Sequence, residues 1–359
     1  MNSKCLPRRG FRTFLMLSMT AVFAVCAVVP EVKLDGNDHR VEPLDQERSP
    51  LVARPADPEL VVSADACVKC HPAEVNQWRK TPHALAYEEL HRRPEAKEIA
   101  SKLGVRSIKY DARCVACHYT QQQQAERTLV IAGISCESCH GAARNWIESH
   151  GDYGGATATR ETESAEHRTA RVDGAIAAGM RNPRNVYLLA QSCYRCHTVQ
   201  DEELVNVGGH SFGSLDFELV SWSQGLIHHN FLSSQGRANE PSSPERLRVM
   251  FVAGMIADLE ASLRAVAQAT TVSDFGVNAA KRSARAAARL RSVLEKVDHQ
   301  TLRDILACYD PEELRVENRT LLEKRADRIA QYGKAFAEQV DPRMLEVLET
   351  FIPAPERWK

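Results

Sequence analysis

Cys136-Glu137-Ser138-Cys139-His140 is one of four segments in this sequence with the pattern C-x-x-C-H. Two cysteines separated by two residues lie about one helical turn apart, so they can bond the two vinyl groups of one porphyrin, and the next residue brings an imidazole to the iron. This pattern is typical of c-type haem attachment. The other three segments are Cys67-Val68-Lys69-Cys70-His71, Cys114-Val115-Ala116-Cys117-His118 and Cys193-Tyr194-Arg195-Cys196-His197.

The number of these motifs argues against coincidence. With 11 cysteines and 13 histidines in 359 residues, a single match by chance is expected in roughly one chain in a hundred. We therefore expect four covalently attached haem c groups and a redox function. The motifs use eight cysteines and leave Cys5, Cys26 and Cys308. A disulfide framework is therefore not expected.

Composition limits the classes of function. Charged residues make up 26% of the chain, and the formal net charge is −1. Such a balance argues against nucleic acid as a partner and leaves electrostatic docking to local patches. The length suggests about two domains.

Residues 1–29 have the features of an export signal. Four basic residues precede an apolar run of sixteen residues, Phe14 to Val29, which is shorter than the ~20 residues needed to span a bilayer. Val25-Cys26-Ala27 offers a small-residue cleavage site. We expect export to the periplasm, or to an equivalent oxidising compartment. The alternative is an uncleaved N-terminal anchor, and this segment is the only membrane association that we expect.

The rest of the chain divides into three parts. Residues 30–58 are charged and contain several prolines, as expected of a flexible linker. Residues 59–240 contain all four motifs and predict a tetrahaem cytochrome c domain. Residues 241–359 have helical periodicity and predict a C-terminal antiparallel helical bundle. The expected fold class is therefore mainly α.

The expected haem domain has weak secondary-structure signals of its own. We predict short helices around each motif and between Pro72 and His91, and a long polar loop from Gly151 to Arg184. Haem would supply the missing core, because burying on the order of 500 Å² of macrocycle contributes roughly 10 kcal/mol. This region is therefore expected to fold only with its cofactors.

The expected bundle has clear helix signals. Ser242-Ser243-Pro244-Glu245 is a helix start with capping serines and an early proline. A second helix is predicted over 274–297, a third from Asp310-Pro311, and a short last one from Asp341-Pro342. The residues expected to face inward are Leu247, Phe251, Met255, Leu259 and Leu263 on the first helix, Val277, Ala280, Ala284, Ala287, Leu294 and Val297 on the second, Leu314, Leu321, Ile329 and Phe336 on the third, and Leu345 and Leu348 on the last.

Two further features have ordinary structural interpretations. Lys281, Arg282, Arg285 and Arg289 form a basic strip on the second bundle helix. Such a strip could dock an acidic partner or anionic lipid, but it is more often a solvated face. Cys308 lies in a short apolar segment and is expected to be a small buried residue rather than a nucleophile.

The last residue of each motif is the expected proximal iron ligand: His71, His118, His140 and His197. An electron-transfer haem normally takes a second axial ligand, which can come from anywhere in the fold. A lone histidine is more often a surface or hydrogen-bonded residue than a ligand, so each candidate needs further context. The candidates are His39, His83, His91, His150, His167, His210, His228, His229 and His299.

The surroundings of the motifs supply that context. Trp78-Arg79-Lys80-Thr81-Pro82-His83-Ala84 follows the first motif, Gly133 precedes the third, and Asn145 and His150 follow the third. Together with the motifs, these residues resemble the tetrahaem cytochrome c-554 family. The resemblance covers about residues 60–200, and the best-known members accept electrons from hydroxylamine oxidoreductase in nitrifying bacteria.

The resemblance implies two distal ligands directly. In that family, the histidine of the W-x-x-T-x-H segment ligates the third haem, which would pair His83 with His140. The histidine shortly after the third motif crosses to the first haem, which would pair His150 with His71.

The other two haems are less defined by the resemblance. The family ligates the fourth haem with a histidine well beyond the last motif, so His228 or His229 would face His197. The second haem is five-coordinate in the family, with the equivalent of His118 as its only protein ligand. Here His210 follows two glycines and departs from that pattern. His210 could be the distal ligand of the fourth haem, in which case His228 or His229 would ligate another haem. Alternatively, His210 could be the second axial ligand of the second haem.

Four functions are compatible with the sequence, of which the plainest is a structural or adaptor subunit in a larger redox complex, with the helical bundle as its assembly surface. The leading hypothesis is a periplasmic carrier that transfers electrons between redox partners, of which one could be a hydroxylamine oxidoreductase-like multihaem enzyme. It needs no catalytic residues. The alternatives are a haem enzyme that reduces or oxidises a small nitrogen species at an open second haem, and a membrane-anchored quinol dehydrogenase of the NapC/NirT type. The short apolar run and the c-554-like spacing count against the quinol dehydrogenase.

Overall fold

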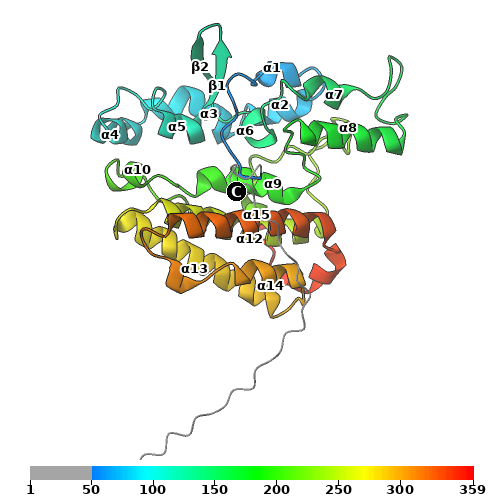
Figure 1. Cartoon of the computed structure of the whole chain (residues 1–359). Coiled ribbons are helices and arrows are strands. Elements are labelled where there is room, and N and C mark those ends of the chain that lie inside the picture. The colour runs from blue at the N-terminus through cyan, green and yellow to red at the C-terminus, as the bar shows by residue number, and fades with distance from the viewer. Residues whose placement is uncertain (1–50) are drawn as a thin grey trace, which may run out of the picture. The chain divides into compact units, whose positions relative to one another are not determined.

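Helices dominate the computed structural model, which describes residues 51–359. The mainly α fold is therefore confirmed for the described residues. The expected export signal and most of the expected linker lie outside them. Figure 1 shows short helices in an upper layer, the helix α9 (Val186–His197) below them, and long helices at the bottom.

Each motif lies on or beside a short helix, as predicted. Three motifs end their helix with the histidine, so the cysteines lie on the last turn. The first motif differs, because its helix ends at Cys67 and His71 directly precedes the next helix. These helices are α1 (Ala64–Cys67), α2 (Pro72–Trp78), α5 (Ala112–His118), α6 (Cys136–His140) and α9 (Val186–His197).

Side-chain caps explain where the motif helices begin. Asp111 caps α5 and Asn185 caps α9, each by accepting backbone N–H groups of the first turn. Ser135 and Ser138 form a reciprocal capping box at α6. Polar caps therefore fix the start of the helices that carry the second, third and fourth motifs.

The chain forms further short helices, and several of the short helices start with proline. A proline in the first turn costs no hydrogen bond, because that N–H has no partner within the helix. Pro72, Pro82 and Pro94 occupy this position. The helices are α3 (Pro82–Glu89), η1 (Leu90–Arg92), α4 (Pro94–Lys102), α7 (Ile147–Gly151), α10 (Glu202–Asn206) and α11 (Leu219–Ser223).

The predicted polar loop between Gly151 and Arg184 is wrong in part, because it contains α8 (Ala165–Ala177). Ser164 starts this helix by accepting the N–H three residues on. Only Ala175 of the helix is buried. Such a narrow contact leaves little apolar periodicity in the sequence.

A two-stranded antiparallel hairpin lies between the second and third motifs and was not predicted. It consists of β1 (Thr120–Gln124) and β2 (Arg127–Ala132), with Gln124 opposite Arg127. The turn uses Ala125 in the left-handed region, with φ of 50°. Four consecutive glutamines and a turn without glycine give little strand signal.

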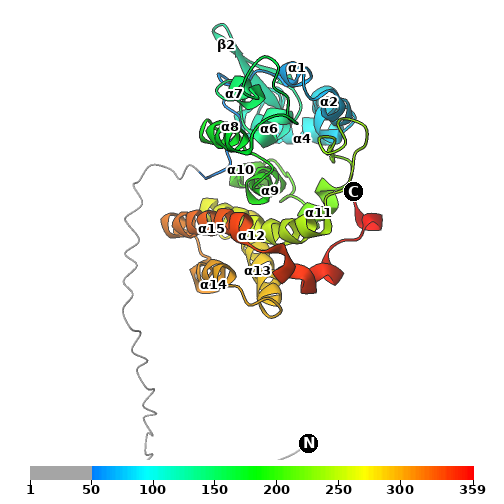
Figure 2. The same cartoon turned by 90° about the vertical axis from the view of Figure 1, so that its right-hand side faces the viewer.

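Long helices occupy the C-terminal part, as expected, but the third of them begins at Arg319 and not at Asp310, where only the short 3-10 helix Pro311–Glu313 forms. Ser243 caps the first of them, α12, by accepting the N–H of Arg246. α12 packs against α13, α15 and α9, so it is buried on all sides. Its neighbours are visible in Figures 1 and 2. The elements are α12 (Pro244–Gln268), α13 (Asp274–Leu294), α14 (Gln300–Ala307), η2 (Pro311–Glu313), α15 (Arg319–Gln339), η3 (Pro342–Phe351) and η4 (Pro355–Arg357).

Several details of these helices differ from the prediction. Val277 and Leu321 are 39% and 37% exposed, and Ala284 is also exposed, so they do not face the core as predicted. α14 has no counterpart among the predicted helices. The expected buried character of Cys308, which follows α14, is confirmed by an exposure of 4%.

The basic strip on α13 is not a uniform solvated face. Lys281 and Arg285 are exposed, but Arg282 is buried and lies 2.6 Å from the carboxylate of Asp258 on α12. Arg282 also donates a 3.1 Å hydrogen bond to the backbone oxygen of His197. This arginine therefore links the long helices to the fourth motif.

The core of the long helices includes α9, which carries the fourth motif. Tyr187 and Tyr194 of α9 belong to the same buried cluster as α12, α13 and α15. Gly333 permits this packing, because a Cβ there would overlap the Tyr187 ring. The described residues form one compact unit. Within residues 51–359, no helix is both long enough and apolar enough to cross a membrane.

Candidate haem sites

Eight histidines face each other in four pairs. Each pair joins the histidine of one C-x-x-C-H motif to a histidine from another segment, and the distance between ring centroids is nearly constant. The pairs are His71–His150 at 6.4 Å, His118–His210 at 6.1 Å, His140–His229 at 6.2 Å and His197–His83 at 6.3 Å.

This spacing fits one iron between each pair of rings. An imidazole nitrogen binds a first-row metal at about 2.0–2.1 Å, and the ring centroid lies about 1.1 Å further out. Two imidazoles on opposite sides of one iron therefore have centroids about 6.3 Å apart. The residues thus fit a haem with two histidine ligands at each motif.

Burial keeps five of the eight paired histidines in the neutral form that iron binding requires. Burial lowers the pKa of His118, His140 and His197 to about 4. Burial also lowers the pKa of His83 and His150. Near neutral pH these imidazoles are uncharged, and each keeps a nitrogen lone pair for the metal.

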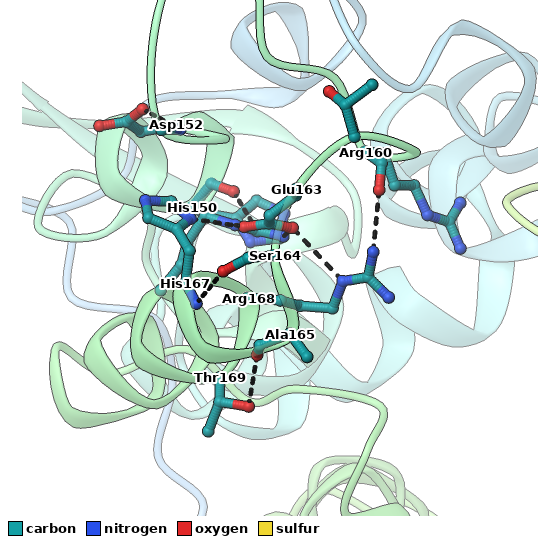
Figure 3. A network of polar contacts seen from close by, with 12 residues as sticks. His150, Asp152, Arg160, Glu163, Ser164, Ala165, His167, Arg168 and Thr169 are labelled. Atoms are coloured by element: carbon teal, nitrogen blue, oxygen red, sulfur yellow. Dashed lines mark hydrogen bonds and ion pairs between the residues drawn. The ribbon is translucent and has the colours of Figure 1, made fainter.

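The first pair is supported by a buried ionic network. Arg171 of α8 donates a 2.6 Å hydrogen bond to the backbone oxygen of His150. The same guanidinium binds Glu163 through two hydrogen bonds of 2.7 Å. His167 and Arg168 also contact Glu163, as Figure 3 shows. The hydrogen bonds from Arg171, and to a smaller extent the one from His167, lower the pKa of Glu163 to about 2.

The second pair places His210 on a tightly bonded turn after α10. Its backbone N–H donates a 3.1 Å hydrogen bond to Leu204, and Gly209 donates a 3.1 Å bond to Val205. Gly209 has φ of +75°, a conformation that favours glycine. The His210 Nδ1 atom lies 2.7 Å from the Ser211 carbonyl oxygen, which leaves Nε2 for the iron.

The third pair joins α6 to the long segment before α12. His140 is bonded to Arg181 through a 2.8 Å backbone hydrogen bond, and its Nδ1 lies 3.3 Å from the Arg181 carbonyl oxygen. The partner ring, His229, has Nδ1 2.7 Å from the carbonyl oxygen of Ile227. Each ring therefore has a backbone acceptor for its Nδ1–H group, which is typical of a metal-binding histidine.

The fourth pair joins the first turn of α3 to the end of α9. Thr81 caps α3 just before His83, and Ile134 donates a 3.0 Å hydrogen bond to the His83 carbonyl oxygen. The His197 ring stacks on Phe217, with centroids 4.1 Å apart and an angle of 17°. Both rings are therefore held from outside the pair.

The cysteines of different motifs meet in two places. Cys67 of the first motif lies beside Cys136 of the third. Cys117 of the second motif lies beside Cys196 of the fourth. The haem attachment sites therefore form two couples. The first site adjoins the third, and the second site adjoins the fourth.

Side chains inside the motifs strengthen these couples. The Glu137 carboxylate accepts 2.9 Å hydrogen bonds from the backbone of Val62 and Ser63, which precede the first motif. Arg195 of the fourth motif donates a 2.6 Å hydrogen bond to the backbone oxygen of Ala116 in the second. The variable positions of two motifs thus join them to their neighbours.

Comparison with known proteins agrees with this geometry. Residues 66–141 match the family model described as cytochrome c554 and c-prime. This segment is therefore similar to the cytochrome c-554 family. It is also similar to cytochrome c-554 from Nitrosomonas europaea, with 35% identity over 98 residues, which are 25% of this chain and 42% of the relative. The chain thus matches less than half of that relative's length, and no solved structure was found to match it.

Similarity to the cytochrome c-554 family supports covalently bound haem c. The matched segment contains the first three motifs, whereas the fourth motif lies beyond it. When bound, haem supplies one-electron chemistry, and the protein supplies the attachment and axial groups. The cysteine pairs of the motifs are the residues that would hold it: Cys67, Cys70, Cys114, Cys117, Cys136, Cys139, Cys193 and Cys196.

The structure changes two of the pairings that the c-554 resemblance implied. His83 faces His197 rather than His140. His140 instead faces His229, so neither His228 nor His229 faces His197. The order of the segments along the chain does not reveal which loops cross, and this caused both errors.

The remaining candidates are placed as follows. His150 lies opposite His71, the pairing that the resemblance implied. His210 lies opposite His118, which was one of two alternatives. His228 is buried beside His229 but belongs to none of the four pairs. His39 lies outside the described residues.

Proposed function

We propose that this chain is a periplasmic tetrahaem cytochrome c that transfers electrons between redox proteins, with two histidine ligands on each of four haem irons. The observation that carries this proposal is the set of four histidine pairs. Each pair contains one motif histidine, and all four ring-to-ring distances lie between 6.1 and 6.4 Å.

The arrangement of the attachment sites supports a carrier. The first and third motifs adjoin through Cys67 and Cys136, and the second and fourth through Cys117 and Cys196. The two couples are joined where Ser192 of α9 donates a 3.2 Å hydrogen bond to the backbone oxygen of Cys139. The four sites are therefore contiguous in the order first, third, fourth, second. Such an order suits electron uptake at one end and release at the other.

His210 argues for a carrier rather than an enzyme with an open iron. A five-coordinate second haem would leave the side opposite His118 free for a small molecule. Here the His210 ring lies 6.1 Å from the His118 ring, at the distance of a second axial ligand. The proposed partners are therefore redox proteins, and a multihaem enzyme of the hydroxylamine oxidoreductase type is one candidate donor.

A ligand-binding experiment tests this proposal. We expect the absorption spectrum of the purified protein to stay unchanged when cyanide is added to the oxidised form or carbon monoxide to the reduced form. His210→Ala should open one iron, so it should bind both ligands and show a high-spin signal. His299→Ala is the matched control, because His299 packs against Phe336 among the long helices. Ligand binding by the unsubstituted protein would contradict the proposal.

A further inference from the structure

Residues 353–359 pack beside the segment that carries His229. The backbone N–H of Lys359 donates a 2.9 Å hydrogen bond to Ser221, at α11. The backbone oxygen of Lys359 accepts a 2.8 Å hydrogen bond from Leu226. Figure 2 shows the C-terminal segment beside α11. We call residues 353–359 the clasp.

The clasp has a defined conformation of its own. η4 bends it, and the Trp358 indole donates a 3.1 Å hydrogen bond to the backbone oxygen of Pro353. The Lys359 ammonium group lies 5.2 Å from the centroid of the Trp222 ring, within the range of a cation–π contact. The clasp is therefore folded against α11 rather than merely adjacent to it.

Gly225 shows how closely the two segments approach. A Cβ atom at this position would overlap the backbone of Lys359. The position has no positive φ that would by itself require glycine. Its small size is therefore needed for the contact with the clasp, not for the shape of the chain.

Leu226 is fixed from two sides by this contact. Its N–H donates to Lys359, and its carbonyl oxygen accepts a 3.3 Å hydrogen bond from Gln77 of α2. His229 follows three residues later. The residues on either side of it are held within their own loop, where Asn239 donates a 2.7 Å hydrogen bond to the backbone oxygen of His228 and accepts one of 2.7 Å from the N–H of Asn230. Further along, Arg160 donates a 2.8 Å hydrogen bond to the backbone oxygen of Leu232. No helix or strand lies between α11 and α12.

We propose that the clasp positions His229 as the distal ligand of the third haem. This inference rests on the proposed function, because it takes His229 as an iron ligand opposite His140. Groups that orient a metal ligand from outside typically contribute about 10–100-fold to metal affinity. Without the clasp, Leu226 loses its N–H partner, and the loop can move His229 away from the iron.

Two variants test the clasp. Gly225→Ala should displace Lys359 from Leu226 while leaving every side chain of the haem sites intact. A chain that lacks residues 353–359 should have the same effect by a different route. In both variants we expect one haem to become partly high-spin by electron paramagnetic resonance, and the reduced protein to bind carbon monoxide at least 10-fold more tightly than the unsubstituted protein.

Gly174→Ala is the matched control. Gly174 lies within α8, where an added Cβ meets no atom within 4 Å. This variant should keep the spectrum of the unsubstituted protein. Low-spin haem without carbon monoxide binding in both clasp variants would overturn the inference.

The same measurements separate the two proposals. If the unsubstituted protein already contains a high-spin haem, the proposed function fails before any variant is compared. If it contains four low-spin haems and the clasp variants do not change them, only the inference about the clasp fails. His229→Ala identifies the haem, since the signal gained in the clasp variants should match the signal of this variant.

Discussion

Glu137 is a buried carboxylate inside the third motif. It is 2% exposed, and its oxygens accept hydrogen bonds from Val62, Ser63 and Ala143. Burial raises its pKa, whereas the three backbone N–H groups lower it. The side chain thus joins the attachment sites of the first and third haems.

Glu137→Gln should destabilise the protein by about 1–3 kcal/mol, because the amide nitrogen cannot accept a hydrogen bond and leaves a buried N–H group unpaired. Denaturant unfolding followed by haem absorbance would measure the change. Glu126→Gln, at an exposed position of the hairpin turn, is the control and should change stability by less than about 0.5 kcal/mol. Equal effects of the two substitutions would contradict this role of Glu137.

The sequence predicted which histidine of each motif would enter a pair, because the spacing of the motif follows from the chemistry of one cofactor. Four of the five predicted distal histidines lie opposite a motif histidine, His228 does not, and two pairings differ from those that the resemblance implied. His83 and His197 come from segments far apart in the chain, and only the tertiary fold brings their ring centroids to 6.3 Å from each other. No local pattern records such a contact.

At the scale of elements, α8 shows how an unexpected helix can support a site. Its Arg171 donates to the backbone of His150, and Glu163 just before the helix holds that arginine. This network could not be predicted, because its residues look like those of an ordinary charged surface helix. The hairpin was missed for a similar reason, since glutamine-rich strands lack the usual β-branched residues.

Glu163 should make the stability of this network depend on pH. Its pKa is lowered from 4.5 to about 2 in the folded protein. The network therefore stabilises the fold fully above about pH 5, and this contribution is lost as the pH falls towards 2. Compared with the unsubstituted protein, Glu163→Gln should be less stable near neutral pH, and the difference should shrink as the pH falls from 5 to 2.

Unfolding by denaturant at several pH values would measure this difference. Glu148→Gln on α7 is a suitable control, because Glu148 is exposed. A stability difference between Glu163→Gln and the unsubstituted protein that stays constant from pH 5 to pH 2 would exclude the network as its source.

At the scale of the whole molecule, the long helices and the motif region meet in one core. Helix periodicity predicted the long helices, but their phase was wrong at Val277 and Leu321. The contact between α9 and α12 could not be predicted, because it depends on a long-range hydrogen bond. The Tyr187 hydroxyl on α9 donates a 2.5 Å hydrogen bond to the carboxylate of Glu260 on α12. Local sequence patterns do not reveal which helices pack against each other.

Arg282 tests the link between the two regions. Arg282→Ala would leave Asp258 buried without its partner, and losing one member of a buried ion pair typically costs about 3–5 kcal/mol. It would also remove the hydrogen bond to His197. Arg285→Ala on the exposed part of the same helix should cost less than about 0.5 kcal/mol. Thermal or denaturant unfolding measures both, and similar values for the two would argue against the link.

The central claim is that four haem irons each have two histidine ligands. A redox titration of the purified protein, followed by electron paramagnetic resonance, tests it most directly, because low-spin and high-spin haems give separate signals. We predict four low-spin haems and no high-spin component at any potential. A high-spin signal, or fewer than four haems, would contradict the account.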